Sequence, residues 1–321
     1  MLRGLMAGIR KYQLHPYTRT LPDLPMVWQA GHVRLLHAGG TGRPLLLIPS
    51  MINGSAILDL IEGRSLARWL AGQGHSVYLL DWGRSTDDIG QAGIDTLLQD
   101  RLLPAIQFLA KDGPVDALGY CMGGTLLAAA APLAGDALRK LVFLATPWDF
   151  HAGDRKLQAM VQYWSASGLA LMAQQGMLPA DWVQTVFASV DATMALRKFT
   201  DFDAMAESDP RAPIFVAVED WLNDAADLPR DIAQTCIQDW YLDNCPAKAA
   251  WRGIGRDTIT HPSLVVAAKR DRLVPPESSR ALFNLLPGAA WQSPEAGHIG
   301  LIAGEGAIED IWTPLERWLS N

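Results

Sequence analysis

The stretch VDALGYCMGGTLL, at residues 115–127, decides the fold. It begins with a short apolar run, which predicts a buried strand, and the Ala- and Leu-rich run after it predicts a helix. The turn between them has the pattern G-x-C-x-G, with Gly119 and Gly123 on either side of Cys121. So tight a turn between a strand and a helix strains its central residue and requires small neighbours. We therefore expect Cys121 to project from the end of a sheet.

In this setting Cys121 is the candidate nucleophile. The helix that follows points its N-terminus at the side chain, which favours the thiolate over the thiol. The backbone N–H of Met122 is placed to stabilise an oxyanion. A second donor is expected in the loop after the strand at 45–48, at Met51 or Ile52. The competing interpretation is a small, buried, inert cysteine, which is common for free thiols, but the strand–turn–helix context favours the nucleophile.

The chain on either side of this turn alternates strands with helices. We predict strands at residues 44–49, 75–81, 115–120, 138–145, 263–268 and 290–293, and helices at 65–74, 94–111, 125–133 and 277–286, before a C-terminal amphipathic helix. Such alternation is typical of a doubly wound, mostly parallel sheet with helices on both faces. Residues 26–36 are expected to form an antiparallel hairpin at its edge. Catalytic groups should lie at the carboxyl ends of the strands.

The alternation stops between residues 148 and 256. This stretch is helical in pattern, contains Trp and Met, and shows no clear parallel strand. We therefore predict one α/β core, made of residues 1–147 and 257–321, that is interrupted by a helical insertion at 148–256. Insertions of this kind usually act as caps or lids over an active site. The alternative is a structural embellishment with no part in the site.

A nucleophile needs a base, and the base needs a group that orients it. In a fold with this turn, the chain order is nucleophile, acid, histidine. Asp271 follows the predicted strand at 263–268, and His298 follows the one at 290–293. Either residue alone could be an ordinary turn or loop residue, but both have the expected type, order and position. The sequence therefore predicts an α/β-hydrolase fold with a triad of Cys121, His298 and Asp271.

Composition limits the other classes of function. The chain has 321 residues, of which 49% are hydrophobic and 19% charged, and its net charge is −7. It has no run of Lys and Arg, so no nucleic-acid partner is expected. Three cysteines without CxxC spacing argue against a disulfide framework or a zinc site, and we predict neither a metal nor a cofactor. We recognise no signal peptide and no membrane span, which favours a cytoplasmic protein.

Several motifs together resemble those of the polyhydroxyalkanoate synthases, whose nucleophile is also a cysteine. The box GYCMGGTLL at residues 119–127 is similar to the box of that family, and residues 57–83 look like its segment after the first core strand. Residues 221–244 resemble part of its cap. KRDRLVP at residues 269–275 and GHI at 297–299 resemble its acid and histidine motifs. The resemblance runs from the first core strand to the C-terminus.

The resemblance implies an acyltransferase. Cys121 would take the acyl group of a 3-hydroxyacyl-CoA thioester and release CoA. His298 would deprotonate the thiol and then the hydroxyl of the next unit, so that a polyester chain grows. Asp271 would either hold the imidazole or activate that hydroxyl directly. The family also implies a homodimer at the surface of polyester granules. The chain length is nearer to that of the short catalytic subunits, which work with a separate partner subunit.

Two other functions are open at this stage. The same triad would serve a hydrolase, such as a thioesterase, an esterase or an intracellular polyester depolymerase, because water and a hydroxyl use the same machinery. The Trp and Met content of residues 148–256 suggests a dry channel, which favours transfer over hydrolysis. The third function is that of a non-catalytic protein that binds granules or regulates a partner. The intact set of Cys, Asp and His argues against it.

Overall fold

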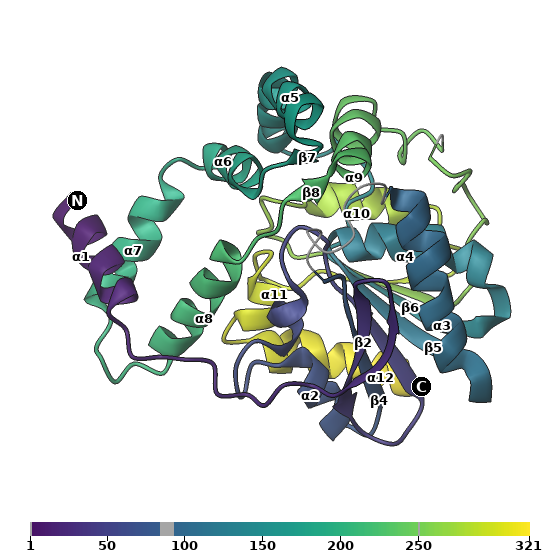
Figure 1. Ribbon diagram of the computed structural model, residues 1–321. Coiled ribbons are helices and arrows are strands. Elements are labelled where there is room, and N and C mark those ends of the chain that lie inside the picture. Colours follow the sequence, from purple (N-terminus) through teal and green to yellow (C-terminus); the bar gives the residue numbers. More distant parts are fainter. Residues whose placement is uncertain (1, 84–92, 250) are drawn as a thin grey trace.

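A central sheet of eight strands organises the molecule (Figure 1). The computed structural model describes residues 2–83, 93–249 and 251–321. The sheet has the order β1-β2-β4-β3-β5-β6-β9-β10. Its strands are β1 (Met26–Ala30), β2 (Val33–Gly39), β3 (Pro44–Ile48), β4 (Ser76–Asp81), β5 (Val115–Tyr120), β6 (Leu138–Leu144), β9 (Ser263–Val266) and β10 (Ala290–Gln292). The predicted strands are confirmed, each with small differences at its ends.

The sheet is parallel from β4 to β10. β3 pairs with β4 and β5, and the parallel pairing continues through β6 and β9 to β10. The hairpin of β1 and β2 joins the edge by antiparallel pairing of β2 with β4. Every residue of β5 is buried, as expected for a strand that helices cover on both faces. The predicted doubly wound, mostly parallel sheet with an antiparallel edge hairpin is confirmed.

Helices cover both faces of the sheet, with α3 and α4 on one face and α2 and α12 on the other (Figure 1). The helical segments around the sheet are η1 (Ser55–Asp59), α2 (Leu66–Gly72), η3 (Thr96–Leu102), α3 (Leu103–Leu109), η4 (Ala110–Asp112), α4 (Met122–Ala134), η5 (Gly135–Ala137), α10 (Pro276–Phe283), α11 (Gly300–Ala303), η7 (Ala307–Trp312) and α12 (Thr313–Ser320). The predicted helix at 94–111 is confirmed as a helical run, but its first part, η3, has wide i→i+5 turns. Pro104 follows η3 at the start of α3 and lacks an N–H donor, which interrupts the regular ladder there.

Between β6 and β9 the chain is helical, as its sequence pattern indicates. This segment contains α5 (Lys156–Gln175), β7 (Met177–Leu178), α6 (Ala180–Val190), α7 (Met194–Ala204), α8 (Arg211–Asn223), β8 (Leu228–Pro229), α9 (Arg230–Gln234) and η6 (Thr235–Leu242). α5 and α6 lie beyond the end of the sheet from which β5 leads into α4 (Figure 1). The division into a core of 1–147 and 257–321 and a cap of 148–256 stays a prediction. In the described part of the chain, no helix combines the length and the apolar character that crossing a membrane requires.

The N-terminal helix α1 (Leu2–Gln13) lies outside the predicted elements and packs on α7, away from the sheet (Figure 1). A Cβ at Gly8 would overlap the backbone carbonyl of Phe199, so the two helices approach this closely only because Gly8 has no side chain. Lys11 donates a hydrogen bond of 2.9 Å to the carbonyl oxygen of Phe202 near the end of α7. A basic side chain there also offsets the negative end of the helix dipole. The pairing of α1 with α7 depends on long-range contacts that no local pattern reveals.

Candidate active site

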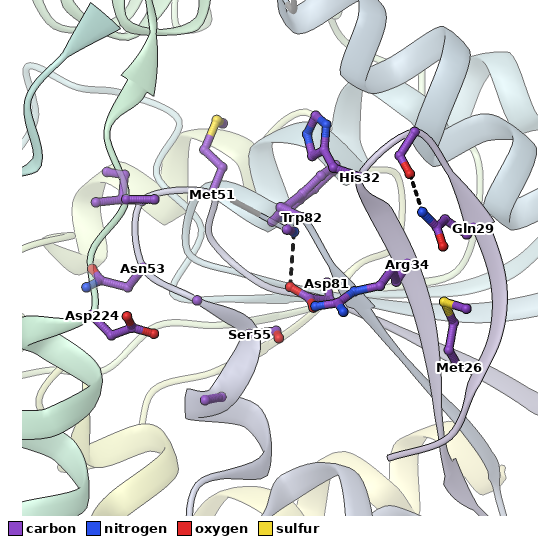
Figure 2. Close-up of a pocket in the computed structure, with 16 residues that line it drawn as sticks. Met26, Gln29, His32, Arg34, Met51, Asn53, Ser55, Asp81, Trp82 and Asp224 are labelled. Carbon is purple, nitrogen blue, oxygen red and sulfur yellow. Dashed lines mark hydrogen bonds and ion pairs between the residues drawn. The ribbon is translucent and has the colours of Figure 1, made fainter. Parts of the chain in front are cut away.

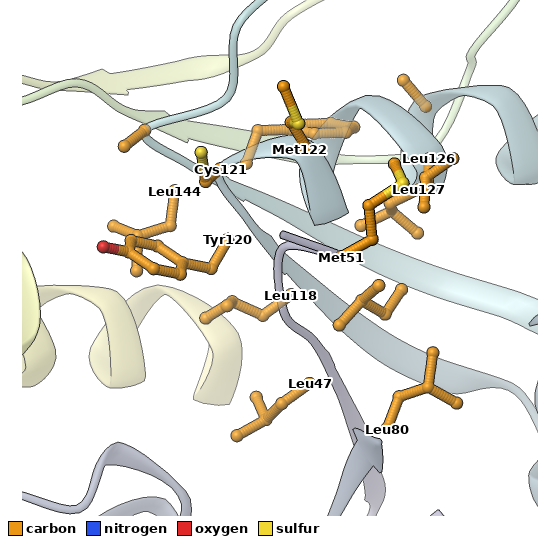
Figure 3. Packing of buried hydrophobic residues seen from close by; sticks show 14 of the residues in the cluster. Leu47, Met51, Leu80, Leu118, Tyr120, Cys121, Met122, Leu126, Leu127 and Leu144 are labelled. Carbon is orange, nitrogen blue, oxygen red and sulfur yellow. The ribbon is translucent and has the colours of Figure 1, made fainter. Parts of the chain in front are cut away.

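Cys121 lies at the turn between β5 and α4, where its φ is 54° and its ψ is −128°. Such strain in a residue with a side chain persists only where the surrounding structure enforces it. Two backbone hydrogen bonds of 2.9 Å do so here, from Cys121 N–H to the carbonyl of Leu144 and from Gly124 N–H to the carbonyl of Cys121. The thiol stands above the end of the strand, between Tyr120 and Met122 (Figure 3). The predicted position of Cys121 is confirmed, and its role as nucleophile stays a prediction.

The glycines of this turn are required by close backbone packing. A Cβ at Gly123 would overlap the carbonyl oxygen of Ile48, at the end of β3. A Cβ at Gly119 would overlap the backbone of Gly124, which itself has no room for a side chain because Thr146 lies against it. The N-terminus of α4 is therefore pressed against the ends of the neighbouring strands. The backbone, rather than side-chain packing, determines where the thiol lies.

Asp271 and His298 form a directly bonded pair beside this turn. Nδ1 of His298 lies 2.7 Å from Oδ2 of Asp271, and both side chains are largely buried. The other carboxylate oxygen, Oδ1, accepts the backbone N–H groups of Leu273 and Val274 at 2.9 and 2.8 Å. These bonds fix the orientation of the carboxylate. The proton on Nδ1 of the imidazole then points at Asp271 and forms the hydrogen bond to it. Nε2 is then the ring nitrogen that is free to serve Cys121, and the pairing that the sequence predicts is present.

The electrostatic surroundings of His298 favour its charged form. Burial by itself would lower the pKa of His298, but the negative charges of Asp271 and Cys121, and the hydrogen bonds to both, outweigh it. The pKa of His298 is therefore raised well above its ordinary value. A charged imidazole is a group that stabilises negative charge in its surroundings.

Two tyrosines near the candidate triad were not predicted as site residues. The ring of Tyr120 lies 5.2 Å from the ring of His298, and its hydroxyl donates to the backbone carbonyl of His298 at 3.3 Å. Burial and the charge of Cys121 raise the pKa of Tyr120 and of Tyr241 well above the usual range, so both remain neutral hydrogen-bond donors. Tyr120 directly precedes Cys121 in the sequence, and this position is the one feature from which its place beside the site could have been predicted. Tyr241 reaches the site from η6, and nothing in the local sequence predicts that approach.

The other two cysteines are poor candidates for the nucleophile. Cys236 is fully buried, and its burial raises the pKa of its thiol to about 12. Burial also raises the pKa of Cys245, and the acidic side chains of Asp239 and Asp243 contribute. Both thiols therefore stay protonated and weakly nucleophilic near neutral pH.

The three residues predicted to supply oxyanion donors lie close to the turn. Met122 is the first residue of α4, so its N–H has no acceptor within the helix. Met51 and Ile52 are buried in the loop after β3. The N–H of Ile52 already lies 3.4 Å from the hydroxyl of Ser50. This favours Met51 over Ile52 as the second donor, and the oxyanion role of all three stays a prediction.

Two cavities of different size and character lie on either side of Ile52. The larger has a volume of about 790 Å³ and is lined by polar and apolar side chains, among which are His32, Arg34 and Asp81 (Figure 2). The smaller has a volume of about 40 Å³, and Met122 forms part of its mostly apolar wall. Ile52 lines both cavities. The loop that carries Ile52 therefore lies between a wide cavity of mixed character and a narrow apolar one.

The fold and the turn at Cys121 agree with a family model described as the alpha/beta hydrolase fold, which matches residues 43–305. The chain belongs to the α/β-hydrolase fold family. One similar solved structure is an alpha/beta hydrolase enzyme from the metagenome of lagoon sediments at Mar Chica, Morocco, with a TM-score of 0.53 and 16% identity over 92% of this chain and 98% of that one. Another is a lipase-esterase related protein from Clostridium acetobutylicum, with a TM-score of 0.51 and 17% identity over 90% of this chain and 99% of that one. At these identities the likeness concerns the α/β-hydrolase fold alone.

In sequence, the chain is similar to poly(3-hydroxyalkanoate) polymerase subunits. The chain is 27% identical over 313 residues to the poly(3-hydroxyalkanoate) polymerase subunit PhaC of Haloferax mediterranei, covering 92% of this chain and 63% of the relative. It is 27% identical over 288 residues to the subunit of the same name from Allochromatium vinosum, covering 87% of this chain and 81% of the relative. The resemblance to the polyhydroxyalkanoate synthase family is confirmed, and these relatives agree with the expectation of an acyltransferase.

Proposed function

We propose that this protein is an acyltransferase that polymerises 3-hydroxyacyl-CoA thioesters into polyhydroxyalkanoate, with Cys121 carrying the acyl chain. The observation that carries the proposal is the arrangement of the candidate triad. A cysteine in a strained strand–helix turn lies beside a histidine whose Nδ1 is 2.7 Å from a buried carboxylate. The similarity to polyhydroxyalkanoate polymerases over most of the chain supports the same conclusion.

In the first half-reaction, the Cys121 thiolate attacks the carbonyl carbon of the CoA thioester. The N–H of Met122 stabilises the negative charge that develops on the carbonyl oxygen, and Met51 supplies the second donor. The bond between the carbonyl carbon and the CoA sulfur then breaks. The departing CoA thiolate takes a proton from the His298 imidazolium, which leaves a neutral imidazole. Thiolate suits this step because its own acyl thioester stays reactive enough to pass the acyl group on.

In the second half-reaction, the neutral imidazole of His298 takes the proton of the incoming hydroxyl. That oxygen attacks the acyl-Cys121 thioester, an ester bond forms, and the Cys121 thiolate leaves. Both oxygens of Asp271 already accept hydrogen bonds, one from His298 and the other from two backbone N–H groups. This supports Asp271 as the group that orients and charges the imidazole, rather than one that activates the hydroxyl directly.

Hydrolysis is the second candidate function. Water would replace the hydroxyl in the second half-reaction, and the products would be free hydroxy acids. The wide cavity next to Ile52, whose lining includes charged side chains, favours this alternative, because it would bring water close to the loop that carries Met51 and Ile52 (Figure 2). The mostly apolar pocket on the other side of Ile52 favours transfer.

The experiment supplies the purified protein with 3-hydroxybutyryl-CoA and follows both CoA release and the acyl product. Polymer supports the proposal. Free hydroxy acid alone, even with a partner subunit present, would replace it with hydrolysis. Replacement of Cys121 by Ala should abolish CoA release. If that variant keeps full activity, Cys121 is not the nucleophile.

We further propose which cofactors, partners and location the working enzyme has. The reaction requires no metal or cofactor, because CoA enters only as the leaving group of the substrate. Residues 148–256 act as a cap over the site. The enzyme works as a homodimer, together with a separate partner subunit, in the cytoplasm at the surface of polyester granules. Size-exclusion chromatography with light scattering tests the dimer, and fluorescence microscopy of a tagged chain tests the granule location.

A further inference from the structure

We infer that Tyr120 is a positioning residue of this site, and that it holds His298 within reach of Cys121. This inference rests on the proposed function, because it concerns how the triad of that function is assembled. It adds what the contacts within the triad leave open, namely how a histidine on a distant loop keeps its place beside the turn that carries the cysteine.

The strand order makes the placement of His298 demanding. Cys121 follows β5, whereas His298 lies in the loop between β10 and α11. Strands β6 and β9 lie between β5 and β10 in the sheet, so this loop has to reach across two strands. Two backbone hydrogen bonds, of 3.0 and 2.9 Å, attach the loop to residues 269–270 after β9. These bonds hold the loop beside Asp271, but they do not connect it to β5.

Tyr120 supplies a connection from β5 itself. It is the last residue of that strand and is 1% exposed. Its hydroxyl donates to the backbone carbonyl of His298 at 3.3 Å, and the same carbonyl accepts the N–H of Leu301 at the longer distance of 3.4 Å. Because the hydroxyl binds the backbone and not the imidazole, the hydrogen bond persists whether the ring is neutral or charged. The connection therefore holds in both half-reactions.

The aromatic ring of Tyr120 makes a second contact with the histidine. Its centroid lies 5.2 Å from that of the His298 ring, with an angle of 32° between the two planes. At such a distance the face of an aromatic ring attracts positive charge. The ring therefore favours the imidazolium, together with Asp271 and Cys121, whose charges act in the same direction. Since Tyr120 is too deeply buried to touch a substrate, we assign it to positioning.

The test removes the hydroxyl alone in Tyr120→Phe and the hydroxyl together with the ring in Tyr120→Leu. We expect Tyr120→Phe to lower kcat for CoA release from 3-hydroxybutyryl-CoA by roughly 10- to 100-fold, because small displacements of a catalytic group are costly. KM should be nearly unchanged, since the residue does not touch the substrate. Tyr120→Leu should lower kcat further, so that phenylalanine restores part of the loss. An unchanged kcat per folded molecule in Tyr120→Phe would mean a purely structural role and would overturn the inference.

Tyr78→Phe is the matched control. The ring of Tyr78 stacks on that of His37 at 4.8 Å, and its hydroxyl accepts a hydrogen bond of 3.2 Å from Ser76. The same atom is thus removed from a second tyrosine–histidine pair of the same sheet, in the middle of β4 and away from its carboxyl edge. We expect kcat to be unchanged in this variant. Equal losses in Tyr78→Phe and Tyr120→Phe, with folded fractions matched by circular dichroism, would contradict a specific role for Tyr120.

Two measurements that need no acyltransferase activity separate the inference from the proposed function. Amide hydrogen exchange of the peptide at residues 293–303 should be roughly 3- to 10-fold faster in Tyr120→Phe, the factor that one lost hydrogen bond contributes. An NMR titration should find the pKa of His298 lower by about 0.5 to 1 in Tyr120→Leu than in Tyr120→Phe, because the leucine variant also lacks the ring.

The outcomes distinguish the two ideas. If the wild type releases no CoA from any 3-hydroxyacyl-CoA but exchange and titration respond as expected, the proposed function fails and the role of Tyr120 in holding His298 stands. If CoA is released while exchange of the loop and kcat both ignore Tyr120→Phe, the inference about Tyr120 fails alone.

Discussion

Oδ2 of Asp271 lies 2.7 Å from Nδ1 of His298, while Oδ1 of the same carboxylate accepts two backbone N–H groups. The side chain of Asp271 is fully buried, and that of His298 is 10% exposed. A buried charge is stable only when it is paired and hydrogen-bonded. The pair is therefore a preorganised element: its geometry is set before any substrate arrives.

Replacing Asp271 by Asn keeps the shape of this side chain but removes its charge. We expect kcat/KM to fall by roughly 10²- to 10⁴-fold, because the amide neither stabilises the imidazolium nor selects the reactive tautomer. The pKa of His298 should fall as well, since the charge of Asp271 raises it. An NMR titration of the His298 ring measures this shift. An unchanged pKa in a folded variant would contradict the electrostatic role assigned to Asp271.

Replacing His298 by Gln should change how stability depends on pH. The pKa of His298 is raised in the folded protein, whereas an unfolded histidine titrates near about 6.5. The stabilisation by the charged imidazole is therefore fully present below about pH 6.5 and is lost as the pH rises through the folded-state pKa. Urea denaturation measures the difference in free energy of unfolding between wild type and variant. This difference should shrink as the pH rises from about 6.5 through the folded-state pKa of His298. A difference that grows with pH would contradict this assignment.

Replacing His298 should also trap the covalent intermediate. Without the imidazole, the incoming hydroxyl has no base, so the second half-reaction slows by at least about 10²-fold. Acyl transfer to Cys121 slows as well, but it persists because a fraction of thiols ionise unaided. Peptide mass spectrometry after incubation with 3-hydroxybutyryl-CoA should find the acyl mass on Cys121. The control is His298→Gln combined with Cys121→Ala. The acyl mass on another residue would refute the assignment.

Gly123→Ala should both destabilise the protein and impair the site. The added Cβ would overlap the carbonyl oxygen of Ile48, and overpacking of this kind costs roughly 1–3 kcal/mol. Because α4 must move away from β3, the Met122 N–H also moves. Gly72→Ala is the control: Gly72 lies in α2 with open space around it, and alanine there should stabilise by about 0.5–1 kcal/mol. Chemical denaturation of both variants measures the difference, and equal effects would count against this packing.

The sequence alone was sufficient for the parts of this protein that depend on local pattern. The alternation of apolar strands and helices predicts the sheet, because periodicity reflects burial along one segment. The G-x-C-x-G turn predicts the strained position of Cys121, since only small residues fit beside it. The order of strands along the chain places Asp271 and His298 at the same end of the sheet, because parallel strands share their carboxyl edge.

Only the tertiary structure decided what depends on distant segments. The packing of α1 on α7, the approach of Tyr241 to Cys121, and the place of Ile52 between two cavities all join residues far apart in the sequence. The hydrogen bonds that occupy both oxygens of Asp271 also require the folded loop. Local propensity carries no information about such contacts, because their energies arise only when the segments meet. The sequence thus determined where Cys121 stands, and the fold determined what surrounds it.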